Sequence, residues 1–227
     1  MTMTRRVASV AEVSLLRRRL TSWYERYGRT FPWRARSAGK YERIISELLL
    51  QRTRAESVAV FAPRFISMFP NWIALAREPI ASLETALRPV GLHARRAASL
   101  NALAKVMASR RGKFPNDRRV LEKLPGIGQY IASAIMVIYH GKAEPFLDVN
   151  MARVLERNFG RRRLADIRYD TWLQSLAIRF VQSRDPLTTN FAILDFAALI
   201  CRPVKPKCGS CSLQWTCKMT GVKSSAA

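Results

Sequence analysis

The spacing of apolar residues constrains the fold of this chain more than any other feature of the sequence. Apolar residues recur three and four positions apart over long stretches, and no segment alternates with the period of two that a half-buried strand requires. Ser9 and Glu12 form the pattern of a helical capping box, and Gly28 is expected to end the helix that follows. The apolar face of that helix would hold Val13, Leu16, Leu20 and Trp23. The sequence therefore predicts an all-α protein.

Further helices are expected along the rest of the chain. In chain order they cover 41–51, 55–69, two short helices opened by Asn71 and Pro79, 93–111, a short helix capped by Asn116 that runs to Lys123, a helix that follows Gly128 and runs to His140, and then 148–159, 169–182 and 188–201. The most apolar run, Ile131 to Tyr139, is about half of the roughly 20 residues that a membrane helix needs. We therefore expect no membrane segment.

The charge of the chain predicts a polyanionic partner. The 227 residues include 39 Lys and Arg against 16 Asp and Glu, which gives a net charge of +23. A hydrophobic content of 48% is too high for a disordered basic tail, so nucleic acid bound by a folded protein is the first expectation. Any single basic run is more simply a solvated helix face. The runs are Arg17–Arg19, Arg95–Arg96, Arg110–Arg111, Arg118–Arg119 and Arg161–Arg163.

The positions of the cysteines indicate a reducing compartment. All four lie between residues 201 and 217, whereas a secreted disulfide scaffold would spread its cysteines to join distant segments. The basic start of the chain, residues 1–6, is followed by a stretch too short and too soon acidic for a secretion signal. We therefore expect a cytoplasmic protein.

The cysteines also have the spacing of a metal-binding loop, Cys201-x6-Cys208-x2-Cys211-x5-Cys217. Four thiolates on one compact loop can enclose a soft metal centre. A zinc site usually pairs two C-x2-C units across a longer insert, and only one such unit is present. A structural zinc site and four unrelated free thiols remain the alternatives.

A second motif is the glycine turn Leu124-Pro-Gly-Ile-Gly128. No strand precedes it, so it does not fit a dinucleotide-binding turn, and it could be an ordinary connection between helices. Between two helices, however, Gly126 and Gly128 would let the backbone approach a phosphate closely, and the next helix would offer its first N–H groups to the same anion. The turn is therefore a candidate for holding a nucleic-acid backbone without reading its sequence.

Two carboxylates are candidates for catalysis. Asp148 opens a helix twenty residues after Gly128, and the helix between them is expected to return the chain to the same side; alone, such an aspartate is more often only a helix cap. Glu47 lies in an apolar helix, between Ile44–Ile45 and three leucines, where a carboxyl group can act as general acid or base. The alternative for Glu47 is an exposed polar face.

From Phe31 to Cys217 the chain resembles the helix-hairpin-helix/GPD superfamily of base-excision DNA glycosylases, which includes endonuclease III and MutY. The residues that carry the resemblance are Phe31-Pro-Trp-Arg34, Ser46–Thr53, Gly91-Leu92, Leu124–Tyr130, Leu147-Asp-Val-Asn150 and Asp195–Cys201 with the cysteine loop. The resemblance implies two helical lobes that flank a DNA-binding cleft. One lobe, 32–140, would carry the hairpin and the base pocket; the other would join 1–31 to 141–217 and hold the cluster, with 218–227 as a flexible tail.

The resemblance also implies roles for the motif residues. The four cysteines would hold a [4Fe–4S] cluster, and Lys205 and Lys207 within that loop would face DNA phosphates. Asp148 would stabilise the oxocarbenium-like sugar formed when an N-glycosidic bond is hydrolysed. Gly126 and Gly128 would bind the DNA backbone.

Other positions bear on which member of the superfamily the chain resembles. Endonuclease III enzymes carry a lysine nucleophile two residues after the second hairpin glycine; this chain has Tyr130 there, so we expect no β-lyase activity. A tyrosine at this place, with Gly91-Leu92 before Arg96-Ala97, resembles the Mig-type mismatch thymine glycosylases, whereas MutY usually has a serine. Glu47 fits both groups. Gln51 and Arg52 would lie near the extruded base, Tyr130 against it, and Leu92 and His93 at the opposite strand.

The expected function is that of a monofunctional DNA glycosylase of base excision repair. The favoured substrate is thymine or uracil mispaired with guanine. The alternatives are a MutY-like enzyme that removes adenine opposite guanine or 8-oxoguanine, and a non-catalytic binder of damaged DNA. The expected partner is double-stranded DNA with a mismatched or damaged base. The protein is expected to be a monomer, and nucleoid-associated if it is bacterial.

Overall fold

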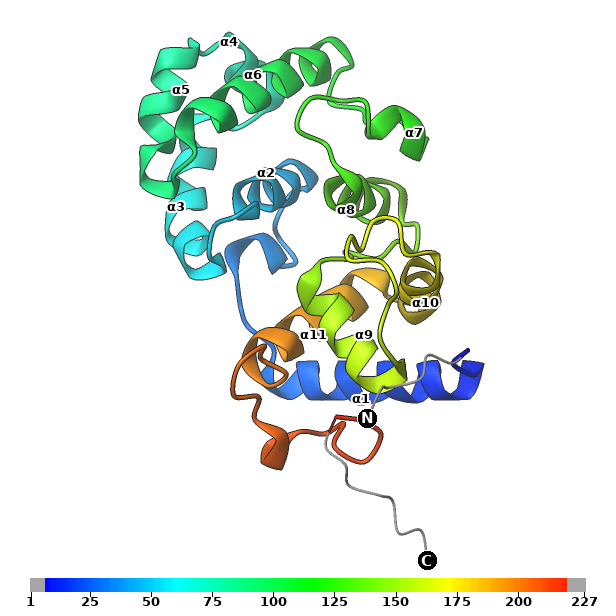
Figure 1. Ribbon diagram of the computed structural model, residues 1–227. Helices are drawn as coiled ribbons and strands as arrows, with labels where there is room; N and C mark the ends of the chain where they lie inside the picture. The colour runs from blue at the N-terminus through cyan, green and yellow to red at the C-terminus, as the bar shows by residue number, and fades with distance from the viewer. Residues whose placement is uncertain (1–6, 220–227) are drawn as a thin grey trace, which may run out of the picture. The chain divides into compact units, whose positions relative to one another are not determined.

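The computed structural model describes residues 7–219, which contain eleven α-helices, three short 3-10 helices and no β-strand (Figure 1). The all-α fold expected from the apolar spacing is confirmed. None of the helices in this range is both long and apolar enough to cross a membrane. Two ranges lie outside the described part of the chain. They are residues 1–6, where the absence of a secretion signal was expected, and residues 220–227 of the expected flexible tail.

The chain divides into two compact units, each described by itself below. One is the continuous segment 30–140, and the other joins the residues up to Arg29 to those from Gly141 onward. Each unit has its own set of buried apolar side chains.

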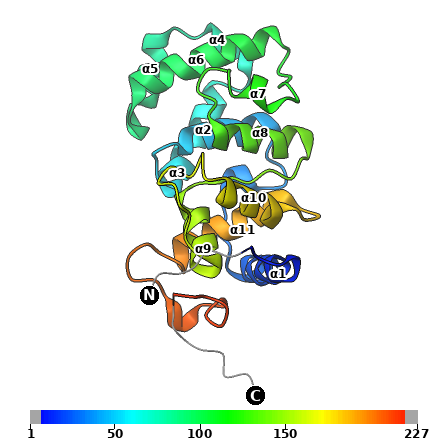
Figure 2. The same ribbon diagram turned by 45° about the vertical axis from the view of Figure 1, so that its right-hand side comes forward.

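The segment 30–140 is built from seven α-helices. They are α2 (Lys40–Leu50), α3 (Ala55–Met68), α4 (Trp72–Arg77), α5 (Ile80–Leu87), α6 (His93–Ser109), α7 (Arg118–Leu121) and α8 (Gln129–His140), with 3-10 turns at Pro32–Arg34 and Arg88–Val90. Helix α2 packs against α3 and α8, and α6 packs against α4 and α5, as Figure 2 also shows for α4, α5 and α6. Side chains with almost no exposure, among them Ile44, Leu49, Phe65 and Leu103, form its core.

The second unit contains four α-helices and the cysteine loop. The helices are α1 (Val10–Tyr27), α9 (Val149–Phe159), α10 (Thr171–Val181) and α11 (Pro186–Leu199), and a 3-10 turn covers Cys208–Ser210. Helix α11 packs against α1, α9 and α10, so the N-terminal helix shares one core with the C-terminal half. Asp195 on α11 is fully buried and accepts hydrogen bonds from the backbone N–H and the Nε of Arg29, at 2.7 and 2.9 Å.

Most helix boundaries agree with the sequence within two residues, and one N-cap was predicted wrongly. The capping box at Ser9 and Glu12 and the end of α1 at Gly28 are confirmed, as are the starts after Asn71 and Pro79. The cap of α7, however, is Asp117 rather than Asn116, because the Asp117 carboxylate accepts hydrogen bonds from the backbone N–H of Arg119 and Val120. The helix also ends at Leu121, before the expected Lys123.

Candidate functional site

A cavity of about 450 Å³ in the segment 30–140 gathers several of the expected site residues. It lies among the end of α2, the start of α6 and the glycine turn before α8. Its lining includes Gln51, Arg52, Leu92, Gly126 and Gly128. These five residues were singled out from separate motifs, and the fold of this unit brings them to one place.

Two residues at this cavity have unusual backbone conformations. Arg52 has φ 57° and Leu92 has φ 51°, both in the left-handed region that side chains other than glycine rarely adopt. Both residues are exposed. Such conformations persist only where the surrounding structure holds them, and they concentrate at functional sites.

Arg96 connects these two turns. Its side chain is 8% exposed, and it donates hydrogen bonds to the carbonyl oxygens of Val90 and Gly91 on one side, at 3.0 and 3.2 Å. On the other side it donates to the Gln51 carbonyl and the Thr53 hydroxyl, at 2.8 and 3.0 Å. Burial lowers the pKa of Arg96, although the guanidinium stays charged at any physiological pH. One buried guanidinium therefore holds both turns beside the cavity.

The glycine turn has the tight backbone that its sequence predicts, but only one of its two glycines has a backbone conformation that favours glycine. Gly126 has φ +73°, and a Cβ there would lie 3.4 Å from the Cβ of Ser99. Gly128 has no positive φ, and a Cβ there would meet no atom within 4 Å. Gln51 also reaches this turn, since its Nε2 donates to the Gly126 carbonyl at 3.4 Å. Gly128 therefore leaves open space just before the N-terminus of α8.

Glu47 and Tyr130 form a pair between α2 and α8. Glu47 is 2% exposed, so the alternative of an exposed polar face is wrong. The Tyr130 hydroxyl donates to Oε2 of Glu47 at 3.2 Å. Tyr130 is half-buried at the second residue of α8. A buried carboxyl group with a phenol beside it is suited to proton transfer or to hydrogen bonding with a polar ligand.

Asp148 lies in the other unit, at the start of α9, and is held by several donors. Its Oδ1 accepts from the backbone N–H of Asn150 and Met151, at 2.9 and 2.8 Å, and its Oδ2 accepts from the Asn150 side-chain amide at 2.6 Å. Asn150 in turn accepts from Nη2 of Arg153 at 3.0 Å. The expected N-cap role is confirmed, and the carboxylate has a fixed orientation.

The surroundings of Asp148 act on its charge in opposite directions. Burial, the larger effect, raises the pKa of this carboxyl above its ordinary value, while the three hydrogen bonds and the positive charge of Arg153 work to lower it. A carboxylate that is partly desolvated but oriented by donors is the kind of group that stabilises a nearby developing cation.

The cysteine loop follows α11 in the same unit. All four thiols are free of disulfides, and they are half-buried except for the exposed Cys208. Cys201 Sγ accepts a hydrogen bond from Nη1 of Arg157 at 3.2 Å, and Cys211 Sγ accepts one from the backbone N–H of Leu213 at 3.4 Å. Within residues 7–219, no three Cys, His, Asp or Glu side chains converge as the ligands of a single metal ion do.

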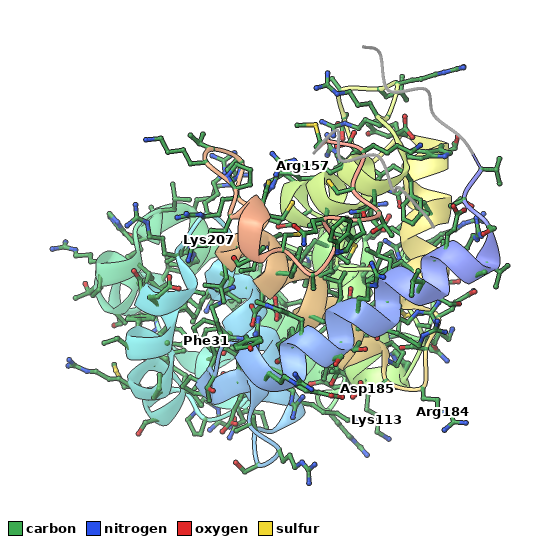
Figure 3. All side chains as sticks on the ribbon, turned by 90° about the horizontal axis from the view of Figure 1, so that it is seen from below. Phe31, Lys113, Arg157, Arg184, Asp185 and Lys207 are labelled. Atoms are coloured by element: carbon green, nitrogen blue, oxygen red, sulfur yellow. The ribbon has the colours of Figure 1, made fainter. Side chains whose placement is uncertain are left out.

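The remaining expected contact residues are exposed. Lys205 and Lys207 lie on the cysteine loop, where Figure 3 labels Lys207, and Lys205 has φ 49°. His93 is exposed at the first residue of α6. The structure places Glu47, Tyr130 and the cavity in one unit, and Asp148 and the cysteines in the other.

Comparison with known protein families decides what this chain is. Residues 45–171 match the HhH-GPD superfamily of base excision DNA repair proteins. The chain belongs to this superfamily. The matched range begins within α2 and ends at the start of α10, so it includes Glu47, the glycine turn and Asp148.

Individual HhH-GPD proteins match over most of this chain. The thymine-DNA glycosylase of Aeropyrum pernix is 35% identical over 210 residues, which cover 90% of this chain and 94% of that protein. The adenine DNA glycosylase of Buchnera aphidicola is 33% identical over 88% of this chain, which spans 56% of that protein. The solved structure of a thermostable thymine-DNA glycosylase superposes with a TM-score of 0.82 at 28% identity, and covers 92% of this chain and 97% of that one.

Sequence patterns alone did not reveal three arginines around the HhH-GPD site residues. Arg96 stood out only as part of a motif, Arg153 orients Asn150, and Arg157 donates to the Cys201 sulfur. A signal for the last two was present: Asn150, Arg153 and Arg157 on α9 follow one another at intervals of three and four residues, the spacing that places side chains on one helix face.

Proposed function

We propose that this HhH-GPD protein is a DNA glycosylase that removes thymine or uracil mispaired with guanine in double-stranded DNA. Its similarity to a thymine-DNA glycosylase over nine-tenths of the chain carries the proposal. Thymine and uracil differ by one methyl group, and a pocket that accepts the larger base sterically admits the smaller one. Extrusion of a mismatched base from the DNA duplex also costs less free energy than extrusion of a paired base.

In the proposed reaction, Asp148 acts on the deoxyribose. Cleavage of the N-glycosidic bond leaves positive charge on the sugar, and the fixed Asp148 carboxylate stabilises that charge. The base departs with the bonding electron pair and takes up a proton from solvent. A water molecule adds to the anomeric carbon and loses a proton to solvent, which leaves an abasic site. Asn150 and Arg153 position the carboxylate through the hydrogen bonds described above.

Glu47 and Tyr130 are the proposed contacts of the extruded base. Their side chains are within hydrogen-bonding distance of each other, so they form one polar pair between α2 and α8. Either group can donate to or accept from the polar edge of a pyrimidine. Tyr130 is not an amine and forms no Schiff base, which supports a monofunctional enzyme without β-lyase activity.

The DNA backbone is proposed to lie along the glycine turn, at the open space beside Gly128. Gln51, Arg52, Leu92 and His93 would contact the bases and strands around the lesion, with the first three at the cavity. In this proposal the segment 32–140 is the base-pocket lobe, and 1–31 with 141–217 is the cluster lobe. The protein would act as a monomer.

The proposed cofactor is a [4Fe–4S] cluster on Cys201, Cys208, Cys211 and Cys217. A cubane takes one thiolate at each of four irons, so its ligands need not meet at one point as they do around a single ion. The hydrogen bonds that Cys201 and Cys211 accept are of the kind that stabilise cluster thiolates. The cluster would fix the loop that carries Lys205 and Lys207 toward DNA phosphates. Iron and sulfide analysis, with absorbance near 400 nm, tests this; a colourless protein that contains zinc would contradict it.

The function is tested by a panel of duplexes in which thymine, uracil, adenine and oxidised pyrimidines each lie opposite all four bases. We expect free base to be released from thymine and uracil opposite guanine, with strand scission only after alkali. Asp148→Asn should bind the same duplexes and release base roughly 10²–10³-fold more slowly. Release of adenine alone would favour the MutY-like alternative, tight mismatch binding without any release would favour the non-catalytic binder, and scission without alkali would contradict the monofunctional mechanism.

A further inference from the structure

A second cavity, of about 480 Å³, lies at the C-terminal end of α9. Of its lining residues, only Arg153 and Arg157 have a role in the function proposed above, Arg153 through Asn150 and Arg157 through the Cys201 sulfur. Its wall comes from the last two turns of α9, from the loop that follows Gly160 and from Met219. Five arginines line it and Glu156 is its single acidic residue. They are Arg153, Arg157, Arg161, Arg162 and Arg163.

Three of these arginines are already bound to the protein. Arg153 donates to the carbonyls of Ala197 and Cys201, and Arg157, labelled in Figure 3, donates to the carbonyl of Arg202 at 2.9 Å. Arg162 forms an ion pair with Glu156 at 2.7 Å. The only carboxylate of the cavity is therefore already paired.

Arg161 and Arg163 are different. Both are exposed, and within residues 7–219 neither guanidinium has a hydrogen bond or an ion pair. The loop that carries them is nonetheless held at 162–164. Glu156 accepts from the backbone N–H of Arg162 at 3.0 Å, and the buried Asp170 accepts from those of Arg163 and Leu164, at 2.8 and 3.1 Å. Two unpaired guanidinium groups thus extend from a well-held loop into a cavity with excess positive charge.

The chemistry of this cavity selects a phosphate. Guanidinium groups bind phosphate oxygens with two parallel hydrogen bonds, and a ligand that brings negative charge relieves the repulsion among clustered arginines. The cavity also has an apolar wall, since Leu164 and Met219 are 48% and 51% exposed. The sugar or base of a nucleotide can cover these apolar side chains, whereas an inorganic anion would leave them exposed to water.

We propose that this arginine cavity is a nucleotide-binding site separate from the glycosylase site. The phosphate lies on Arg161 and Arg163, and the sugar or base lies against Leu164 and Met219. The nucleotide is either free or part of a DNA strand, because both present the same groups.

The test compares Arg161→Ala/Arg163→Ala with Arg18→Ala/Arg26→Ala, which removes the same charge from exposed positions of α1. ADP and a lesion-free dT8 oligonucleotide are the two probes, and neither is a glycosylase substrate, so the outcome is independent of the proposed activity. Binding is measured by titration calorimetry, and the bound region by hydrogen exchange of the backbone amides in 160–166.

We expect a probe to protect 160–166 from exchange, and the Arg161/Arg163 variant to bind it at least about tenfold more weakly, because each guanidinium supplies charge-assisted hydrogen bonds. The α1 variant should stay within about twofold of the unsubstituted protein. An effect on ADP alone identifies a free nucleotide, and an effect on dT8 alone identifies a strand. Equal weakening by the two variants, or protection only outside 160–166, would overturn the proposal.

Discussion

At the residue scale, the structural role of Asp148 and the chemical role proposed for it have opposite effects on stability. As the N-cap of α9 it satisfies two backbone N–H groups, which stabilises the helix. As a partly buried anion it carries a desolvation cost, which is why its pKa is raised. An asparagine at this position would cap α9 equally well without a charge. Helix capping alone therefore does not explain why the chain has an aspartate here.

The raised pKa of Asp148 predicts how stability and activity depend on pH. This carboxyl group ionises at a lower pH in the unfolded chain than in the folded protein. The free energy of unfolding therefore decreases as the pH rises from the pKa of Asp148 in the unfolded chain to its pKa in the folded protein. We expect Asp148→Asn to gain stability relative to the unsubstituted protein through that pH range, as measured by urea unfolding at several pH values. Base release should increase with pH over the same range and fall roughly 10²–10³-fold in the variant at neutral pH.

Two outcomes would contradict this account of Asp148. A stability difference that is constant with pH would mean that burial does not disfavour the ionised carboxylate. Base release at an undiminished rate in Asp148→Asn would mean that another group stabilises the sugar cation. Asp166→Asn is a matched control, because Asp166 is a solvent-exposed carboxylate paired with Arg168 in the same unit.

Arg96 is the second residue whose substitution has a clear expected outcome. Arg96→Ala leaves the carbonyls of Val90 and Gln51 without the donor they now share, at a cost of about 1–3 kcal/mol for an unsatisfied buried polar group. We expect the loss in urea unfolding, and partial rescue by Arg96→Lys, which keeps the charge but not the forked geometry. Arg95→Ala, the exposed neighbour, should leave stability within about 0.5 kcal/mol. An unchanged unfolding midpoint in Arg96→Ala would show that the turns at Arg52 and Leu92 are stable without the hydrogen bonds from Arg96.

At the scale of elements, the two hairpin glycines serve different purposes and can be separated by experiment. Gly126→Ala must adopt φ near +73°, which costs about 1–2 kcal/mol for a residue with a side chain. Gly128→Ala meets no neighbour and should not change stability, but its methyl group would occupy the space proposed for a phosphate. We expect Gly126→Ala to lower the unfolding midpoint and Gly128→Ala to weaken only duplex binding, as measured by fluorescence anisotropy. Equal effects of both substitutions on stability would refute this separation.

The elements also show what the sequence can and cannot predict. Helices with strong local signals, such as α1 with its capping box and apolar face, were predicted correctly because those signals act within a few residues. Asp117 was missed as the cap of α7 because both Asn116 and Asp117 are good caps, and only the backbone course decides between them. The pairing of Glu47 with Tyr130 and the four bonds of Arg96 were not predictable from spacing, because they join residues from different elements through the tertiary fold.

At the scale of the whole molecule, a net charge of +23 makes binding to DNA strongly electrostatic. Each phosphate neutralised by Lys or Arg releases condensed counterions, which lowers the slope of log K against log salt by about 0.9 for duplex DNA. The exposed arginines of the basic runs and the lysines of the cysteine loop allow many such contacts, so most of the affinity for a duplex should be independent of sequence.

Binding and base removal should therefore respond differently to salt. With six or more phosphate contacts, affinity for a lesion-free duplex should fall about 10³-fold or more between 50 and 200 mM salt, as measured by anisotropy. Asp148 is half-buried and oriented by near neighbours, so its effect on a bound nucleotide is screened much less than exposed charges are. The single-turnover rate of base release from the preformed complex should then change by no more than about threefold over that range. If the rate fell in proportion to affinity, long-range charge rather than the local carboxylate would govern the chemical step.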